Sequence, residues 1–149
     1  MAHALDHHLA LIGFMGAGKT TLGSHVADLI GRPFVDLDRE IEKSTRRSIP
    51  DLFRQEGEKS FRMLEAEETR RTLKRERPAV IALGGGAIET PAIREALREY
   101  ALTLRTPRTV GAAAGAAVRR LEAGRWELRV GFEGPAGAYV RRTLSLPLS

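Results

Sequence analysis

The fold of this chain is decided by residues 9–31, which read LALIGFMGAGKTTLGSHVADLIG. The apolar run at residues 9–12 predicts a buried strand, and apolar residues at helical spacing predict a following helix that ends at Gly31. Between the two, residues 13–20 match the pattern G-x-x-x-x-G-K-[ST] in the strand–loop–helix context in which this pattern binds phosphate. The chain therefore carries a complete phosphate-binding loop.

The residue types in this loop suit a nucleotide and its metal ion. Glycines let the backbone approach a phosphate closely, so that successive N–H groups at the helix N-terminus face the anion. Lys19 supplies a positive charge for the β and γ phosphates, and the hydroxyl of Thr20 is a hard oxygen ligand for Mg²⁺. Thr21 is expected in the first helical turn rather than among the metal ligands. The predicted nucleotide-binding residues are Gly16, Ala17, Gly18, Lys19, Thr20 and Thr21.

Composition limits the classes of protein to consider. Of the 149 residues 42% are hydrophobic and 29% are charged, which is typical of one globular domain. Lys and Arg exceed Asp and Glu by 24 − 19 = 5, but the charges are dispersed and aromatic residues are few. We therefore expect small anionic ligands rather than nucleic acid. The chain has no cysteine, which excludes disulfides and thiolate metal sites.

The N-terminal residues and the apolar segments predict a cytoplasmic protein without a membrane span, and a monomer is the default expectation. Residues 1–8 lack the basic and then apolar pattern of a secretory signal, and no stretch approaches 18 apolar residues. His3, His7 and His8 have a spacing that suits a metal, but a frayed terminus is the simpler interpretation.

A second strand is predicted at residues 34–38, and it ends in two acids. Because polar residues of a buried strand gather at the rim, Asp36 and Asp38 should lie at its carboxyl end, where open α/β sheets bind ligands. Two residues apart on a strand, their carboxylates would share one face, one near the Mg²⁺ shell and the other near a substrate. The alternative is a pair of solvated turn acids or a helix N-cap before residues 39–42.

Residues 39–76 are predicted to be mostly helical, with a cap at Ser48 and an interruption at residues 55–57. Arg62 and Glu65 lie about one turn apart on the second of these helices, close enough to interact.

A buried strand at residues 79–83 then delivers Gly84-Gly85-Gly86 to the same sheet edge. Three consecutive glycines make sense where a ligand or another backbone must come very close, and a flexible connector is the alternative. The expected architecture is a three-layer α/β sandwich with a central parallel sheet of about five strands. Four strands are assigned, at residues 9–12, 34–37, 79–83 and 101–105, and the fifth is left open.

Together these stretches resemble shikimate kinase, a P-loop family of the nucleoside monophosphate kinase-like group. The resemblance covers about residues 8–105, with all motifs in order. It rests on Gly13 to Thr20, Asp36-Leu37-Asp38, Ser48-Ile49 with Phe53 and Gly57-Glu58, Phe61-Arg62 with Glu65, and Leu83-Gly84-Gly85-Gly86-Ala87.

The resemblance implies an enzyme that uses ATP and Mg²⁺ to phosphorylate a hydroxyl of shikimate, giving shikimate 3-phosphate in aromatic amino acid biosynthesis. It implies that Lys19 holds the phosphates and that Thr20 and Asp36 belong to the metal site. Asp38 would orient or deprotonate the attacking hydroxyl, and Arg62 would pair with the shikimate carboxylate. The implied substrate residues are Asp38, Phe53, Phe61, Arg62, Glu65, Gly84, Gly85 and Gly86, with Glu65 holding Arg62 and the glycines walling the ring.

The resemblance ends after about residue 105. The family's lid carries an arginine that reaches the ATP phosphates, often in an Arg-Pro-Leu-Leu stretch, and residues 106–149 contain no such stretch. The nearest candidates for a catalytic lid arginine are Arg119, Arg120 and Arg125. None of them sits in a matching motif, and Arg129 fits no worse. An alternation of apolar residues at 126–132 is compatible with a strand.

Two explanations of this segment remain open, namely a shortened lid within one domain of residues 1–149 or a reading frame shifted after about Arg105. Two functions remain open as well: an active shikimate kinase, or a nucleotide-binding module that has lost catalysis with its lid. A kinase for gluconate or a nucleotide would explain the acidic pair, Arg62 and the three glycines less well.

Overall fold

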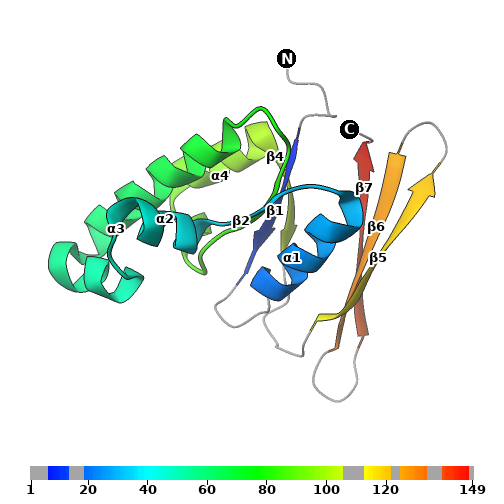
Figure 1. The fold of residues 1–149 in the computed structure, drawn as a ribbon, viewed down its shortest axis with the longest axis horizontal. Coiled ribbons are helices and arrows are strands. Elements are labelled where there is room, and N and C mark those ends of the chain that lie inside the picture. Colours follow the sequence, from blue (N-terminus) through cyan, green and yellow to red (C-terminus); the bar gives the residue numbers. More distant parts are fainter. Residues whose placement is uncertain (1–6, 14–18, 106–112, 122–124, 134–138, 148–149) are drawn as a thin grey trace.

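The computed structural model describes residues 7–13, 19–105, 113–121, 125–133 and 139–147, and for the last three ranges it describes the backbone. The chain forms two sheets with helices around the first (Figure 1). In chain order the elements are β1 (His8–Ile12), α1 (Lys19–Ile30), β2 (Phe34–Asp36), α2 (Leu37–Thr45), α3 (Ile49–Leu73), β3 (Val80–Ala82), the 3₁₀ helix η2 (Ala87–Glu89), α4 (Pro91–Tyr100), β4 (Ala101–Arg105), β5 (Ala113–Leu121), β6 (Arg125–Glu133) and β7 (Tyr139–Pro147).

The first sheet is parallel and has the order β2-β3-β1-β4. Alternate residues of β1 lie on the two faces of the sheet. Leu9 and Leu11 pack with α1, while Ala10 and Ile12 pack with residues of α3 and α4. Both faces are thus covered by helices, as a parallel sheet requires. This confirms the predicted three-layer α/β architecture and the four assigned strands. The parallel sheet has four strands among the described residues, rather than about five.

The C-terminal strands form a separate antiparallel sheet of order β5-β6-β7, which lies on the α1 side of the molecule (Figure 1). The predicted strand at 126–132 is confirmed as β6. Residues 139–147 form the last of these strands, β7. Among the described helices, none combines the length and the apolar composition that a membrane span needs.

The long helix α3 begins as the sequence predicts. The hydroxyl of Ser48 accepts a hydrogen bond from the N–H of Asp51 at 3.2 Å, and Pro50 occupies the first turn. Gly57 has φ 82° and ψ 171°, which interrupts the helix at the predicted place. An L-residue rarely adopts such torsions, which explains the glycine.

His8 joins three elements of the core. Its side chain is fully buried in β1, where Nδ1 accepts a hydrogen bond from the N–H of Ala79 and Nε2 donates to the carbonyl of Leu73, both at 3.0 Å. The backbone N–H of Ala79 can only donate, so the ring is the neutral tautomer with its proton on Nε2. The prediction of a frayed terminus was therefore wrong for His8, because the first strand begins one residue earlier than the apolar run.

This histidine makes stability depend on pH. Burial lowers the pKa of His8 from its ordinary value of 6.5, so on acidification the unfolded chain takes up this proton before the native chain does. The contribution of His8 to the free energy of unfolding is present above about pH 6.5 and is lost as pH falls below that value. We expect the free energy of unfolding of the wild type to approach that of His8→Asn as pH is lowered, measured by urea denaturation. A difference between the two proteins that stays constant with pH would contradict this role.

Candidate functional site

The site lies where the carboxyl ends of three neighbouring strands meet. The phosphate-binding loop follows β1, Asp36 ends β2, and the three glycines follow β3, and these strands are adjacent in the sheet. The two acids and the triple glycine therefore reach the edge of the sheet at which the loop begins, as the sequence predicts.

The end of the phosphate-binding loop is tied to β1 and β2. Lys19 begins α1, and its Nζ donates to the carbonyl of Gly13 at 2.7 Å. The next residue, Thr20, donates its hydroxyl to Oδ2 of Asp36 at 3.1 Å. Thr21 is exposed in the first turn of α1, as expected. Gly16, Ala17 and Gly18 lie outside the described residues.

Asp36 has two structural partners at once. While Oδ2 accepts from Thr20, Oδ1 accepts the N–H groups of Asp38 and Arg39 at 3.1 and 3.3 Å and so caps α2. The N-cap alternative was therefore right for Asp36. The prediction that both carboxylates share one face of a strand was wrong, because β2 ends at Asp36 and Asp38 belongs to the first turn of α2.

Asp38 stands among charges of both signs. Burial raises the pKa of its carboxyl, and the neighbouring Asp36 raises it further, while Lys19 and Arg62 act in the opposite direction. Burial lowers the pKa of Lys19, while the carboxylates of Asp38 and Asp36 act in the opposite direction. The carboxyl of Asp38 thus lies in the electrostatic field of both the nucleotide loop and the arginine of α3.

The oxygen atoms of Thr20 and Asp36 fit Mg²⁺. This ion prefers oxygen ligands and is usually bound by one or two carboxylates together with substrate phosphates and water. A hydroxyl and a carboxylate 3.1 Å apart at the end of the loop match that requirement. In the described part of the chain, no group of three His, Cys, Asp or Glu residues could hold a metal, so a cage made by the protein alone is not found there.

The guanidinium of Arg62 is held from several sides on α3. Its Nη1 donates to Oε1 of Glu65 at 2.9 Å, and Nη2 lies 3.8 Å from Oε1 of Glu58. The rings of Phe53 and Phe61 lie 4.4 Å apart, and the Cζ of Arg62 is 5.9 and 5.5 Å from their centroids. The carboxylate of Glu65 is only 2% exposed, whereas that of Glu58 is 70% exposed.

Two of the three glycines allow side chains from α2 and α3 to approach the loop after β3. A Cβ on Gly86 would lie 2.4 Å from Nη2 of Arg62, and a Cβ on Gly84 would lie 2.9 Å from Oδ1 of Asp38 and 3.0 Å from Oε2 of Glu65. The glycine run is therefore packed against the polar residues of the site, and the flexible-connector alternative does not account for it.

Two site residues were given no role from the sequence. Glu58 precedes Arg62 by four residues on the helix, a spacing that signals an ion pair. Glu42 accepts a hydrogen bond from the N–H of Ile49 at 3.0 Å and raises the pKa of Asp38, but no local pattern in the sequence connects it with Asp38.

Arg119 and Arg125 lie on β5 and β6, of which the backbone is described, and their role as lid arginines stays a prediction.

Comparison with known proteins gives a consistent assignment. The family model of shikimate kinase matches residues 15–113. Shikimate kinase of Bacillus licheniformis is 40% identical over 99 residues, which are 66% of this chain and 56% of that protein. The enzyme of Nitrosomonas europaea is 45% identical over 97 residues, which are 65% of this chain and 46% of the relative.

Solved structures of shikimate kinases are also similar to this chain. Shikimate kinase from Acinetobacter baumannii in complex with shikimate superposes with a TM-score of 0.66 at 40% identity, covering 70% of this chain and 57% of that one. The enzyme of Bacteroides thetaiotaomicron gives 0.64 at 36% identity, covering 66% of this chain and 56% of that one. The chain spans about half the length of the curated relatives that it matches. Because the family model matches more than half of the chain, this protein belongs to the shikimate kinase family.

Proposed function

We propose that this chain transfers the γ-phosphoryl group of ATP to a hydroxyl of shikimate and so produces shikimate 3-phosphate. The observation that carries the proposal is the packing of Asp38 and Arg62 against Gly84 and Gly86, beside the Thr20–Asp36 pair at the end of the phosphate-binding loop. Phosphoryl transfer requires positioning and neutralisation of charge more than covalent catalysis, and this arrangement offers both.

The nucleotide side of the site would be formed by α1 and the loop before it. Lys19 and the backbone of residues 16–21 would bind the phosphates, and Thr20 with Asp36 would hold Mg²⁺. When bound, the ion neutralises negative charge on the phosphate oxygens. Thr20 and Asp36 are already hydrogen-bonded to each other, so their oxygen atoms need little rearrangement to bind it.

The acceptor side would be formed by α3 and the glycine loop. Arg62 uses Nη1 for Glu65 at 2.9 Å, while the exposed carboxylate of Glu58 lies at the longer distance of 3.8 Å from Nη2. A substrate carboxylate would displace Glu58 and pair with the guanidinium, which Glu65, Phe53 and Phe61 keep in place. Gly84, Gly85 and Gly86 would line the ring of the substrate with backbone atoms.

Asp38 would act on the attacking hydroxyl. Its carboxylate lies against Gly84, between the nucleotide loop and Arg62, and a raised pKa makes it a better hydrogen-bond acceptor and base than an exposed aspartate. It would orient the hydroxyl toward the phosphorus atom or accept its proton during transfer.

We extend the proposal to the whole chain as one kinase domain in which residues 106–149 stand in place of the family's lid. Arg119 or Arg125 would then approach the transferring phosphoryl group, where an arginine is worth about 10³ or more in rate. The protein would work as a cytoplasmic monomer that needs neither nucleic acid nor membrane. The absence of cysteine and the dispersed charge support this part.

The direct test is release of ADP from ATP in the presence of shikimate, followed with a coupled assay, with other hydroxy acids as controls. Turnover that depends on shikimate supports the proposal. Absence of both turnover and shikimate binding would refute it. Binding of ATP without transfer to any acceptor would instead favour a nucleotide-binding module.

Lys19→Ala and Arg62→Ala should separate the two halves of the site. Lys19→Ala removes the positive charge that would bind the phosphates, so we expect loss of turnover and weaker nucleotide binding.

Arg62→Ala removes a charged hydrogen-bonding partner, so the KM for shikimate should rise by about tenfold or more, with nucleotide affinity unchanged. Arg62→Lys is the matched control, which keeps the charge but loses the bidentate geometry. An unchanged KM in Arg62→Ala would show that its assigned role is wrong.

Gly86→Ala should weaken acceptor binding through Arg62. The added methyl group would lie 2.4 Å from Nη2, so the guanidinium must move away from the glycine loop. We expect a KM for shikimate raised by about tenfold, comparable with the loss of a charged hydrogen bond, and no change in ATP binding. The double variant with Arg62→Ala should be no worse than Arg62→Ala alone. Additive losses in the two variants would mean that Gly86 acts independently of Arg62.

Because of Asp38, kcat/KM should decrease at acidic pH. Burial and Asp36 raise the pKa of this carboxyl above its ordinary value of 3.8, so protonation as pH falls removes the base earlier than for an exposed aspartate. We expect kcat/KM, measured from about pH 4 to about pH 8, to decrease on acidification. Asp38→Asn should lower kcat by about 10²-fold or more while the fold is kept. Glu65→Gln, which removes the buried carboxyl beside Arg62, should retain the decrease of kcat/KM at low pH. A wild-type kcat in Asp38→Asn would disprove the assignment.

A further inference from the structure

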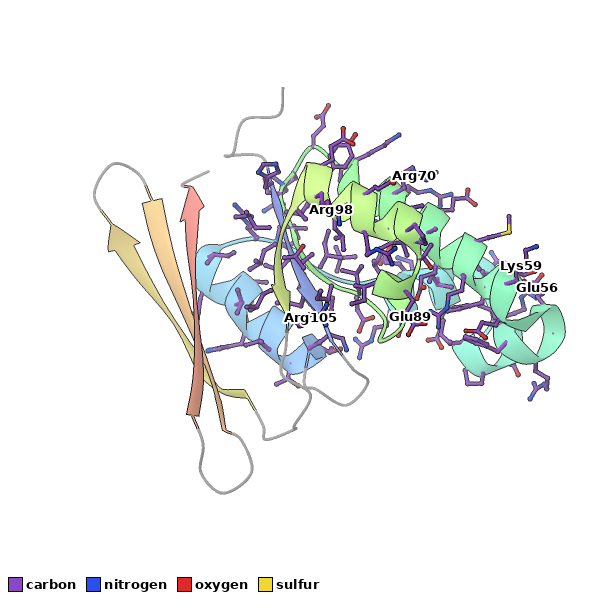
Figure 2. All side chains as sticks on the ribbon, turned by 180° about the vertical axis from the view of Figure 1, so that it is seen from behind. Glu56, Lys59, Arg70, Glu89, Arg98 and Arg105 are labelled. Atoms are coloured by element: carbon purple, nitrogen blue, oxygen red, sulfur yellow. The ribbon has the colours of Figure 1, made fainter. Side chains whose placement is uncertain are left out.

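A pocket of about 220 Å³ lies between α3 and α4. Figure 2 shows Arg70, one of its lining residues, on α3 next to α4. Arg70 follows Arg62 by eight residues on the same helix, which is about 12 Å along the axis, and no lining residue belongs to the candidate functional site. The volume of the pocket is below the range of about 300–1,000 Å³ that is typical of sites for drug-sized ligands, so the pocket suits a smaller molecule.

The α3 side of the pocket is positively charged. Five basic residues lie in the range 70–77, at the end of α3 and in the turn after it. Two of them, Arg71 and Arg75, form ion pairs with glutamates of α3 and α2. Arg70 and Lys74, which are one helical turn apart, line the pocket instead. Within the part of the chain that the structure describes, neither of these two side chains forms an ion pair.

The α4 side of the pocket has an apolar floor and an acidic rim. Ala92, Ala96 and Tyr100 follow one another at a spacing of four residues, so they lie on one face of α4. Ala96 and Tyr100 are half-buried and pack on the core below the pocket. Glu95 and Glu99 form a second row with the same spacing, and both are exposed. The small alanine side chains leave the space between the helices open.

Tyr100 engages one of the two acids. A hydrogen bond to Glu99 raises the pKa of the Tyr100 phenol, so the hydroxyl keeps its proton and the ring stays neutral. Glu95, by contrast, has no ion-pair partner among the described residues. The carboxylate of Glu95 is therefore available to a positively charged group in the pocket.

These charges decide which kind of molecule the pocket can bind. The two cations, Arg70 and Lys74, balance the two carboxylates of Glu95 and Glu99, and none of the described ion pairs joins the two sets. A simple anion would be attracted by the cations but repelled by the carboxylates, and the reverse holds for a simple cation. A molecule that carries a carboxylate and an ammonium group can pair with both sides. The alanines and the tyrosine ring suit an apolar side chain on that molecule.

We propose that the pocket between α3 and α4 binds a free α-amino acid with an apolar side chain. The carboxylate of the amino acid would pair with Arg70 and Lys74, and its ammonium group would pair with Glu95. Its side chain would lie on the two alanines beside the ring of Tyr100. This binding is separate from the site of phosphoryl transfer, so it does not depend on the proposed function.

The test is isothermal titration calorimetry of the full chain with L-leucine and with L-phenylalanine. Each amino acid is compared with two analogues that have the same apolar group. The analogues 4-methylpentanoate and 3-phenylpropanoate lack the ammonium group, whereas 3-methylbutylamine and 2-phenylethylamine lack the carboxylate. The comparison shows whether both charged groups of the ligand are needed.

The variant Arg70→Gln/Lys74→Gln removes both cations of the pocket. Its matched control is Lys43→Gln/Arg77→Gln, which also removes one lysine and one arginine, at exposed positions outside the pocket. Thermal unfolding verifies that both variants fold.

The variant Glu95→Gln removes the acid that would bind the ammonium group, and Glu76→Gln is its control at an exposed position outside the pocket. For the wild type and both control variants, we expect a Kd of about 1 mM or lower for at least one of the two amino acids. Loss of charge-assisted hydrogen bonds should raise this Kd at least about tenfold in Arg70→Gln/Lys74→Gln and in Glu95→Gln. Each analogue should bind at least about tenfold more weakly than its parent amino acid.

Several results would overturn the proposal. One is the absence of saturable binding of either amino acid up to about 10 mM. Another is equal binding of an analogue and its parent, which would indicate a site for a single charge. Equal losses in the pocket variants and their controls would show that the pocket is not the site. Binding that Arg62→Ala abolishes and Arg70→Gln/Lys74→Gln retains would place the amino acid in the acceptor site instead.

Discussion

The carboxylate of Asp36, at the end of β2, connects the two helices that begin beside it, α1 and α2. One oxygen accepts the hydroxyl of Thr20 in α1, and the other accepts two backbone N–H groups at the start of α2. A carboxylate at a helix N-terminus is stabilised both by these hydrogen bonds and by the helix dipole. Because the cap sets where α2 begins, it also sets the position of Asp38 relative to Lys19. A single side chain at the end of β2 thus fixes the starts of α1 and α2 relative to each other.

In the rest of the site, side chains from α2 and α3 pack closely on the glycine loop after β3. Asp38 comes from α2, Glu65 and Arg62 come from α3, and all three lie against Gly84 or Gly86. Buried carboxyls placed in this way have raised pKa values, chiefly through loss of solvation, and the arginine between them offsets part of that effect. The arrangement costs stability, which is common at sites that bind charged ligands.

Much of the fold could be predicted because the decisive signals are local. The loop of residues 13–20, the four apolar runs, the cap at Ser48 and the break at Gly57 each depend on a few consecutive residues, and the structure confirms them where it describes them. The features that were missed depend on contacts distant in sequence. His8 is buried through its bonds to Leu73 and Ala79, and the end of β2 is set by the cap that Asp36 forms. No sequence motif predicts the antiparallel sheet after residue 112, apart from the alternation of apolar residues in β6.

The break at Gly57 determines how the aromatic side chains near Arg62 pack. Phe53 and Phe61 are eight residues apart, and on a continuous helix this separation would place them about 12 Å apart along the axis. Their rings are instead 4.4 Å apart, because the chain turns at a φ of 82° between them. The aromatic support of Arg62 thus originates in one backbone torsion rather than in the choice of side chains. A residue without a side chain thus sets the geometry around the guanidinium of Arg62.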